Sequence, residues 1–242
     1  MMSTDADLHA YLGRLLGWSS PARIDDALQS LELAQEGRAQ LLLCGPGDLV
    51  PFAYGLHRRA FGDDTPFVVC DPRRRDTPAT VRAPANFVDP TAAFEAALGG
   101  SLCIRRRRPP KGFGALVGRL RDTDSVQYIC LDNDCLQWLV RPGPIEIPAL
   151  SQRLGDLPRI VDECMLEASR DLLATPVVLA PRDRNWLLEH GAEMSLSEVE
   201  KAVLRIVALR TSATLTSAAT RLGMAAVSLS RWASRRRLAS AP

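Results

Sequence analysis

The chain has 242 residues, of which 46% are hydrophobic and 24% charged, and its formal net charge is +2. These values are typical of a globular protein and argue against a fibrous or disordered one. The length accommodates a medium domain and a small one. Its longest apolar runs, such as residues 40–44 and 175–180, fall far short of the ~20 residues that a membrane span requires. The first 17 residues lack a signal-peptide pattern, so we expect a cytoplasmic protein that contacts no membrane.

Apolar runs alternate with helical patterns over residues 1–148. Two short helices are expected within residues 7–36. The expected strands are residues 41–44, 67–70, 102–104 and 126–131, and the expected helices between them are residues 50–61, 91–98 and 112–120. The proline-bearing stretch 71–90 is expected to be mostly loop. This alternation predicts an α/β fold, with a parallel sheet flanked by helices on both faces.

Helical periodicity replaces the strand pattern after residue 150. Ile160, Cys164 and Leu172 belong to one apolar stripe, which predicts a helical segment and linker over residues 149–190. A small all-α domain is expected over residues 191–242. It opens with a capping box, in which Ser195 caps the helix and Glu198, three residues on, bonds back to it.

Leu215–Ala233 has the pattern of a helix-turn-helix. Ala218 and Ala219 are small where two helices pass close together, and Gly223 stands where the turn needs a positive φ. Arginines follow, ending in the run Arg235–Arg237, and arginine at this place meets DNA phosphates. The candidate DNA contacts are Thr216, Ser228, Ser230, Arg231, Arg235 and Arg236.

Residues 191–242 resemble the Fis-type DNA-binding domain that closes many bacterial regulators. The resemblance implies DNA as a partner and a homodimer built by the long first helix of this domain. Residues 225–227 are Ala-Ala-Val, where the family usually presents polar or basic side chains, so direct base readout is expected to be thin. A helix-turn-helix converted into a protein-binding surface is therefore the alternative.

Four earlier segments are similar, in chain order, to the AAA+ module of NtrC-class enhancer-binding proteins, the activators that contact a sigma factor. These segments are residues 41–57, 67–70, 93–104 and 145–158. The resemblance implies a P-loop after the first strand and a Walker B strand ending near residue 104. It also implies that residues 149–190 form a helical lid.

The functional residues of that module are missing. A P-loop needs a lysine and a hydroxyl residue, but the loop from Gly45 to Val50 has neither, and Asp48 adds negative charge. Arg105 and Arg106 replace the two Walker B carboxylates. The sigma-factor-contacting loop is absent, and the arginine-finger segment is expected to be deleted between residues 131 and 145. The resemblance thus implies a degenerate domain that uses no cofactor and instead binds a signal or a protein partner.

Residues 105–108 and the loop at residues 45–47 leave anion binding open, beside the simpler interpretation of a solvated basic patch. The six cysteines, Cys135 among them, lack zinc-ligand spacing, and the three histidines accompany no nucleophile motif. We therefore expect no metal site, no catalytic residue and no enzyme. The predicted function is sequence-specific transcription regulation, and the alternative is a protein-interaction adaptor.

Overall fold

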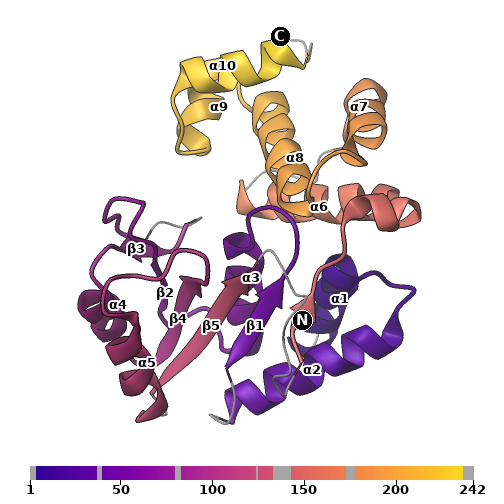
Figure 1. Cartoon of the computed structure of the whole chain (residues 1–242). Helices are drawn as coiled ribbons and strands as arrows, with labels where there is room; N and C mark the ends of the chain where they lie inside the picture. The colour runs from indigo at the N-terminus through magenta and orange to yellow at the C-terminus, as the bar shows by residue number, and fades with distance from the viewer. Residues whose placement is uncertain are drawn as a thin grey trace. The chain divides into compact units, whose positions relative to one another are not determined.

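The computed structural model describes residues 4–36, 40–79, 83–123, 125–132, 143–172 and 178–236. The chain forms two compact units, Met1–Pro148 and Ala149–Pro242, whose elements are labelled in Figure 1. The sequence-based expectations for Cys135, Arg237, residues 175–177 and the segment 133–142 lie outside the described residues.

The first unit is built on a parallel sheet of six strands in the order β3-β2-β4-β5-β1-β6. The strands are β1 (Leu41–Cys44), β2 (Phe67–Cys70), β3 (Ala85–Phe87), β4 (Gly100–Arg105), β5 (Val126–Asp132) and β6 (Ile145–Glu146). Leu41 pairs with Ile129, and Phe67 pairs with Ser101, both in parallel register. The four expected strands and their parallel pairing are therefore confirmed.

The two strands at the edges of the sheet, β3 and β6, were not predicted. They have three and two residues, too few for an apolar pattern to distinguish a strand from a loop. Backbone pairing with a longer neighbour holds each of them, with Val68 opposite Ala85 and Leu43 opposite Ile145. The expectation that residues 71–90 are mostly loop is corrected to this extent.

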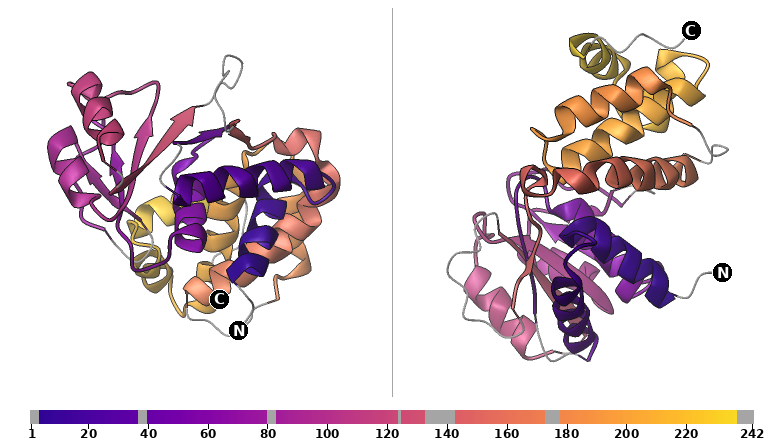
Figure 2. Two further views of the ribbon diagram at one scale, coloured as in Figure 1. Left: turned by 90° about the horizontal axis from the view of Figure 1, so that it is seen from below. Right: turned by 90° about the vertical axis from the view of Figure 1, so that its right-hand side faces the viewer.

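Helices cover both faces of the sheet. They are α1 (Thr4–Leu16), α2 (Pro21–Gln35), α3 (Val50–Ala60), α4 (Pro90–Ala96) and α5 (Phe113–Arg121). Helices α1, α2 and α3 lie on one face, whereas α4 and α5 lie on the other (Figure 2). Because each parallel strand needs a crossover to reach the next, this two-sided cover follows from the alternation in the sequence.

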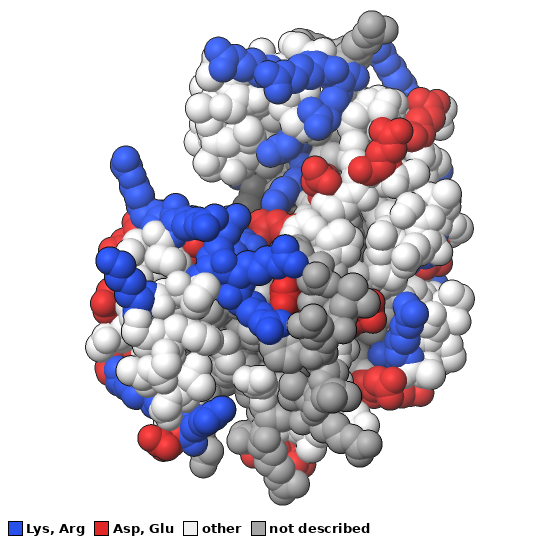
Figure 3. All heavy atoms as spheres, in the orientation of Figure 1, with Lys and Arg blue, Asp and Glu red and all other residues white. Residues whose placement is uncertain are grey.

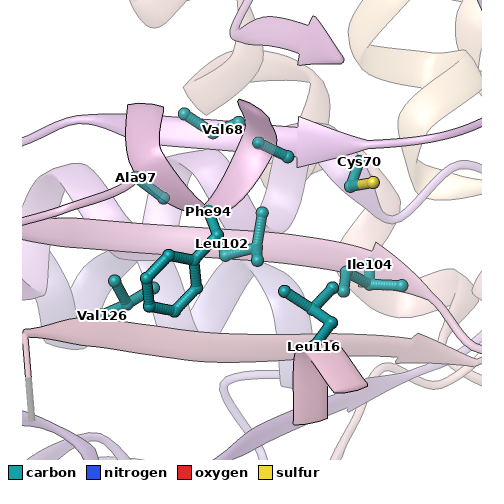
Figure 4. Close-up of a cluster of buried hydrophobic side chains, with 9 residues drawn as sticks. Val68, Cys70, Phe94, Ala97, Leu102, Ile104, Leu116 and Val126 are labelled. Carbon is teal, nitrogen blue, oxygen red and sulfur yellow. The ribbon is translucent and has the colours of Figure 1, made fainter. Parts of the chain in front are cut away.

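A buried cluster joins α4 and α5 to the sheet. Phe94 of α4 and Leu116 of α5 pack on Leu102 and Ile104, which alternate along the central strand β4 (Figure 4). Burying a side chain of this size contributes about 1.5–3 kcal/mol. The period-two alternation along β4 thus sets which of its side chains face α4 and α5.

The second unit is helical. Its elements are η1 (Leu150–Gln152), η2 (Leu154–Asp156), α6 (Leu157–Asp171), α7 (Pro181–Gly191), α8 (Leu196–Thr211), α9 (Leu215–Arg221) and α10 (Ala226–Arg235). Helix α8 lies at its centre and contacts α6, α7 and α9. Two bonds of 2.7 and 2.8 Å from Arg210 of α8 to the fully buried carboxylate of Asp183 fix α7 to α8. No described helix is long and apolar enough to cross a bilayer.

Candidate DNA-binding surface and the carboxyl edge of the sheet

Helices α9 and α10 are joined by a turn that requires glycine. Gly223 has a φ of +65°, as the sequence predicted. The backbone N–H of Gly223 donates to the carbonyl of Thr220, and that of Met224 donates to the carbonyl of Ala219, each at 3.0 Å. These two bonds form the Schellman motif, which satisfies the last carbonyls of α9 and sets the direction of α10.

Small and apolar side chains lock the two helices together. Ala218 and Ala219 of α9 are buried, as are Leu229 and Trp232 of α10, whereas Leu222 and Met224 in the turn are half-buried. The alanines allow the close approach that the sequence predicted. Helix α8, which precedes these two helices, begins with the expected capping box. The Ser195 N–H lies 2.8 Å from the Glu198 carboxylate.

The opposite face of α10 is exposed along its whole length. The exposed residues of this helix are Val227, Ser228, Arg231, Ser234 and Arg235. Their spacing places them on one helical face, which begins with Val227 and continues as a strip of hydroxyls and guanidinium groups. Ser228, Arg231 and Arg235, three of the candidate DNA contacts, are thus brought together. Ser230 is half-buried at the border of the strip, and Thr216 is exposed in the first turn of α9.

Arg236 has different surroundings from the other candidates. It follows α10 as the C-cap residue, and its guanidinium lies 4.9 Å from the ring centre of Trp232 and 5.8 Å from that of Trp186. Burial, and after it the charge of Arg235, lowers the pKa of Arg236. Its main contact is therefore cation–π stacking on indole rings.

Sequence reasoning missed this aromatic cluster. The two indole rings meet edge to face at 6.4 Å, and the guanidinium of Arg205 lies 5.2 Å from the Trp232 ring. The four-residue spacing of Trp232 and Arg236 was a usable signal for their contact. The spacing of Trp186 and Trp232 along the chain gave no signal that their rings are in contact.

The apolar side chains of α8 are already used within the second unit. Its buried residues are Leu196, Ser197, Val199, Ala202, Val203, Ile206, Val207, Ala208 and Leu209. The homodimer expected through residues 191–242 stays a prediction, and any contact with a second copy has little apolar surface of α8 to use.

The loop at residues 45–49, which the resemblance compares with a P-loop, lies between strand β1 and helix α3, as expected. Gly45 has a φ of +148°, and a Cβ at this position would lie 2.7 Å from the carbonyl oxygen of Ile147. Glycine is therefore required by the close passage of the chain beyond β6. The glycine of this loop has a structural explanation that involves no phosphate.

The side-chain carboxylate of Asp48 lies at the amino end of α3. An Oδ1 atom of Asp48 lies 3.4 Å from the N–H of Val50 and 2.7 Å from Nη2 of Arg105. A P-loop holds phosphate at this end of the helix, where N–H groups and the helix dipole favour negative charge. Relative to that arrangement the charges are exchanged, because the loop supplies the anion and the end of β4 supplies the cation.

Further arginines surround this pair at the carboxyl edge of the sheet. We call the set formed by Arg73, Arg74, Arg75, Arg105, Arg106, Arg107 and Arg108 the arginine edge; lysines and arginines gather over this edge of the first unit in Figure 3. Two buried acids lie beneath it. Asp71 is within 3.3 Å of Arg105, and Asp132 is 2.9 Å from Arg106.

Asp71 and Asp132 were not predicted as part of this site. Each comes at the carboxyl end of an apolar strand, Asp71 directly after β2 and Asp132 as the last residue of β5. Since parallel strands end at the same edge, this position was a usable signal that the acids meet the arginine run after β4. Among the described residues, no histidines, cysteines and acids gather in a group that could hold a metal ion.

The protein thus has an α/β fold, with a parallel sheet of six strands followed by carboxyl-terminal helices. No known protein-family model matches the chain, and no curated protein sequence is similar to it.

Solved structures of NtrX from Brucella abortus are similar to it. The complex with ADP has a TM-score of 0.50 and 15% identity, over 89% of this chain and 68% of NtrX. A second NtrX structure has a TM-score of 0.49 and 14% identity, over 88% and 67% of the two chains. The complex with ATP has a TM-score of 0.49 and 16% identity, over 88% of this chain and 67% of NtrX. At these identities the likeness concerns the fold alone.

Proposed function

We propose that this protein is a sequence-specific DNA-binding transcription regulator that does not hydrolyse ATP. The observation that carries the proposal is the exposed strip on α10, which presents Ser228, Arg231 and Arg235 opposite a face that is buried on α9. A helix of this kind, held by a short turn against a second helix, fits the major groove of DNA. The resemblance of residues 191–242 to the Fis-type domain supports the same function.

The residues of this surface have different roles in the proposal. Arg231 and Arg235, four residues apart, contact phosphates along one strand and supply most of the affinity. Ser228 lies near the amino end of α10 and contacts base edges, together with Thr216 and Ser230 at the margins. Arg236, stacked on the indoles, holds the end of α10 in place and adds positive charge there.

A salt titration of duplex DNA binding by the full chain tests the phosphate contacts. Each counterion-releasing contact contributes about 0.9 to the slope of log affinity against log salt, so Arg231→Ala and Arg235→Ala should each lower the slope by about 1 on every sequence. The matched control is the pair Arg159→Ala and Arg170→Ala, exposed arginines of α6, which should leave the slope unchanged. If the R231A/R235A protein kept its affinity and its slope, the regulator proposal would be wrong.

The serines are tested by sequence preference rather than by affinity. Ser228→Ala and Ser230→Ala should reduce the ratio of specific to non-specific binding more than they reduce non-specific binding, because hydroxyls at base edges carry sequence information. A selection of bound genomic fragments by wild type and by each variant measures this ratio.

The α/β unit is proposed to bind a signal or a protein partner rather than a nucleotide. The similar NtrX structure holds ADP. In this chain Asp48 stands at the amino end of α3 and is paired with Arg105, so a phosphate there would meet a carboxylate and would have to break an ion pair.

A protein-interaction adaptor is the second candidate. It is favoured by the apolar amino end of α10, where Val227 is 57% exposed. Under this alternative the full chain would bind DNA no better than the R231A/R235A variant does, and Val227→Ser would weaken binding to a protein partner.

A further inference from the structure

The arginine edge of the first unit is a continuous basic surface. Its two arginine runs follow β2 and β4, which are neighbours in the sheet, with Cys70 paired to Ile104 at their carboxyl ends. The two strands are about 4.8 Å apart where they are paired, so the loops that hold residues 73–75 and 105–108 begin side by side at this edge of the sheet. Residues 71–76 and 105–111 together hold seven arginines and one lysine.

Buried acids hold several of these arginines from below. Asp71 is fully buried and lies within 4 Å of Arg74, Arg105 and Arg108. Asp132 is 4% exposed and lies near Arg106 and Arg107. An arginine has five N–H donors, so a carboxylate on one side of the guanidinium leaves donors on the other. Arg74, for example, is 53% exposed beside Asp71.

Positive charge is in surplus over this surface. Among the described residues, Asp48, Asp71 and Asp132 form ion pairs with arginines of this surface, and Asp76 and Asp89 are nearby acids, so five carboxylates stand against seven arginines and Lys111. Arg73 and Arg75 are exposed, and neither forms an ion pair with another described residue. A concentration of one charge repels itself and raises the local potential, which favours a polyanion.

We propose that the arginine edge is a second DNA-contact surface, which binds the phosphate backbone of a duplex without reading its sequence. The proposal goes beyond the regulator function, since it concerns the other unit of the chain and needs no residue of α9 or α10. One guanidinium group donates two parallel hydrogen bonds to two phosphate oxygens, so arginine fits the phosphate backbone better than lysine does.

The composition of the edge favours DNA over an acidic protein. Stable protein interfaces have an apolar centre, whereas interfaces with DNA are more polar and more positive. Within the described residues, the exposed large hydrophobic side chains are at positions 88, 98, 154, 166, 178 and 227, and thus outside both arginine loops. A single small nucleotide is disfavoured because the guanidinium groups spread over two loops and Asp48 is at the helix end.

The test compares two charge-matched variants of the full chain. R73A/R75A removes two arginines at the carboxyl edge, and R58A/R121A removes two exposed arginines near the ends of α3 and α5, which lead to the opposite edge. On non-specific duplex DNA, R73A/R75A should lower the salt slope by about 2, and R58A/R121A should leave it unchanged. R73K/R75K, which keeps the charge, should retain most of the slope.

The same variants in the R231A/R235A background separate this proposal from the proposed function. The R231A/R235A protein should still bind duplex DNA weakly, and adding R73A/R75A should remove most of that binding. If R73A/R75A matched its control while R231A/R235A lost affinity, the edge proposal would be overturned and the regulator function would stand. Polyglutamate serves as the probe for an acidic protein partner. If R73A/R75A lost polyglutamate binding but kept DNA binding, the edge would be assigned to an acidic protein, and the DNA proposal would also be overturned. Circular dichroism checks that each variant is folded.

Discussion

His57 is a titratable residue of α3 whose side chain is enclosed in the core. Its Nδ1 atom lies 2.8 Å from the Ser101 hydroxyl of β4, and its Nε2 atom lies 3.1 Å from the carbonyl oxygen of Thr65. The side chain is 1% exposed, and burial lowers the pKa of His57 because the imidazolium loses its hydration. The ring is therefore held neutral as a hydrogen-bonding link between α3 and the sheet.

We predict that this histidine makes the protein less stable in mild acid. The unfolded chain has a histidine pKa of about 6.5, so as the pH falls below that value the unfolded state takes up a proton before the folded state does. The stability that neutral His57 contributes is present above about pH 6.5 and is lost on acidification. Urea unfolding between about pH 7.5 and pH 5 should show a smaller loss for His57→Gln than for wild type.

Exposed His9 provides the control for this effect. His9→Gln should lose stability with falling pH as wild type does. A His57→Gln protein with the same pH dependence as wild type would show that burial of this ring is not what couples stability to pH.

The geometry of the turn between α9 and α10 can be tested by comparing Gly223, which lies in the turn, with Gly118, which lies in a helix. A Cβ at Gly223 or at Gly118 within α5 would have no neighbouring atom within 4 Å, but Gly223 alone has a positive φ. We predict that Gly223→Ala costs about 1 kcal/mol through backbone strain, whereas Gly118→Ala gains up to about 1 kcal/mol through helix propensity. Thermal or urea unfolding measures both, and stabilisation by Gly223→Ala would contradict the turn geometry.

Local patterns were sufficient for much of the fold. The runs at residues 41–44 and 67–70 predicted strands because continuous apolar residues between turn signals are typical of a parallel sheet. Gly223 and the Ser195–Glu198 capping box were predictable because a turn or cap depends on residues close in sequence. The strands β3 and β6 were missed since their pairing is fixed by neighbours distant in the chain.

The candidate sites were less predictable than the fold. Periodicity indicated the exposed strip of α10, but the stacking of Arg236 on Trp186 depends on how α7 and α10 pack. The strand-end positions of Asp71 and Asp132 indicated the edge of the sheet at which they lie, but not that β4 and its arginines lie between β2 and β5.

For the whole molecule, we predict no turnover of Mg²⁺-ATP. The P-loop lysine and hydroxyl are absent, and Arg105 at the end of β4 would repel the metal that a Walker B carboxylate holds. A phosphate-release assay on the full chain should give a rate equal to that of the buffer. Turnover that disappeared on substitution of Gly47 or Arg105 would show that hydrolysis persists.

The central place of α8 affects how the chain can be divided. Arg210 of this helix is bound to Asp183 of α7, and its apolar side chains are covered by α6 and α7 as well as by α9. A fragment that begins after α7 would expose those side chains, at a cost of about 1.5–3 kcal/mol for each large side chain fully uncovered, and would leave Arg210 without its carboxylate. We predict that it unfolds at lower urea than a fragment starting at residue 149. Helices α6 and α7, which were expected to form a lid and linker, would then belong to the same folding unit as α8, α9 and α10.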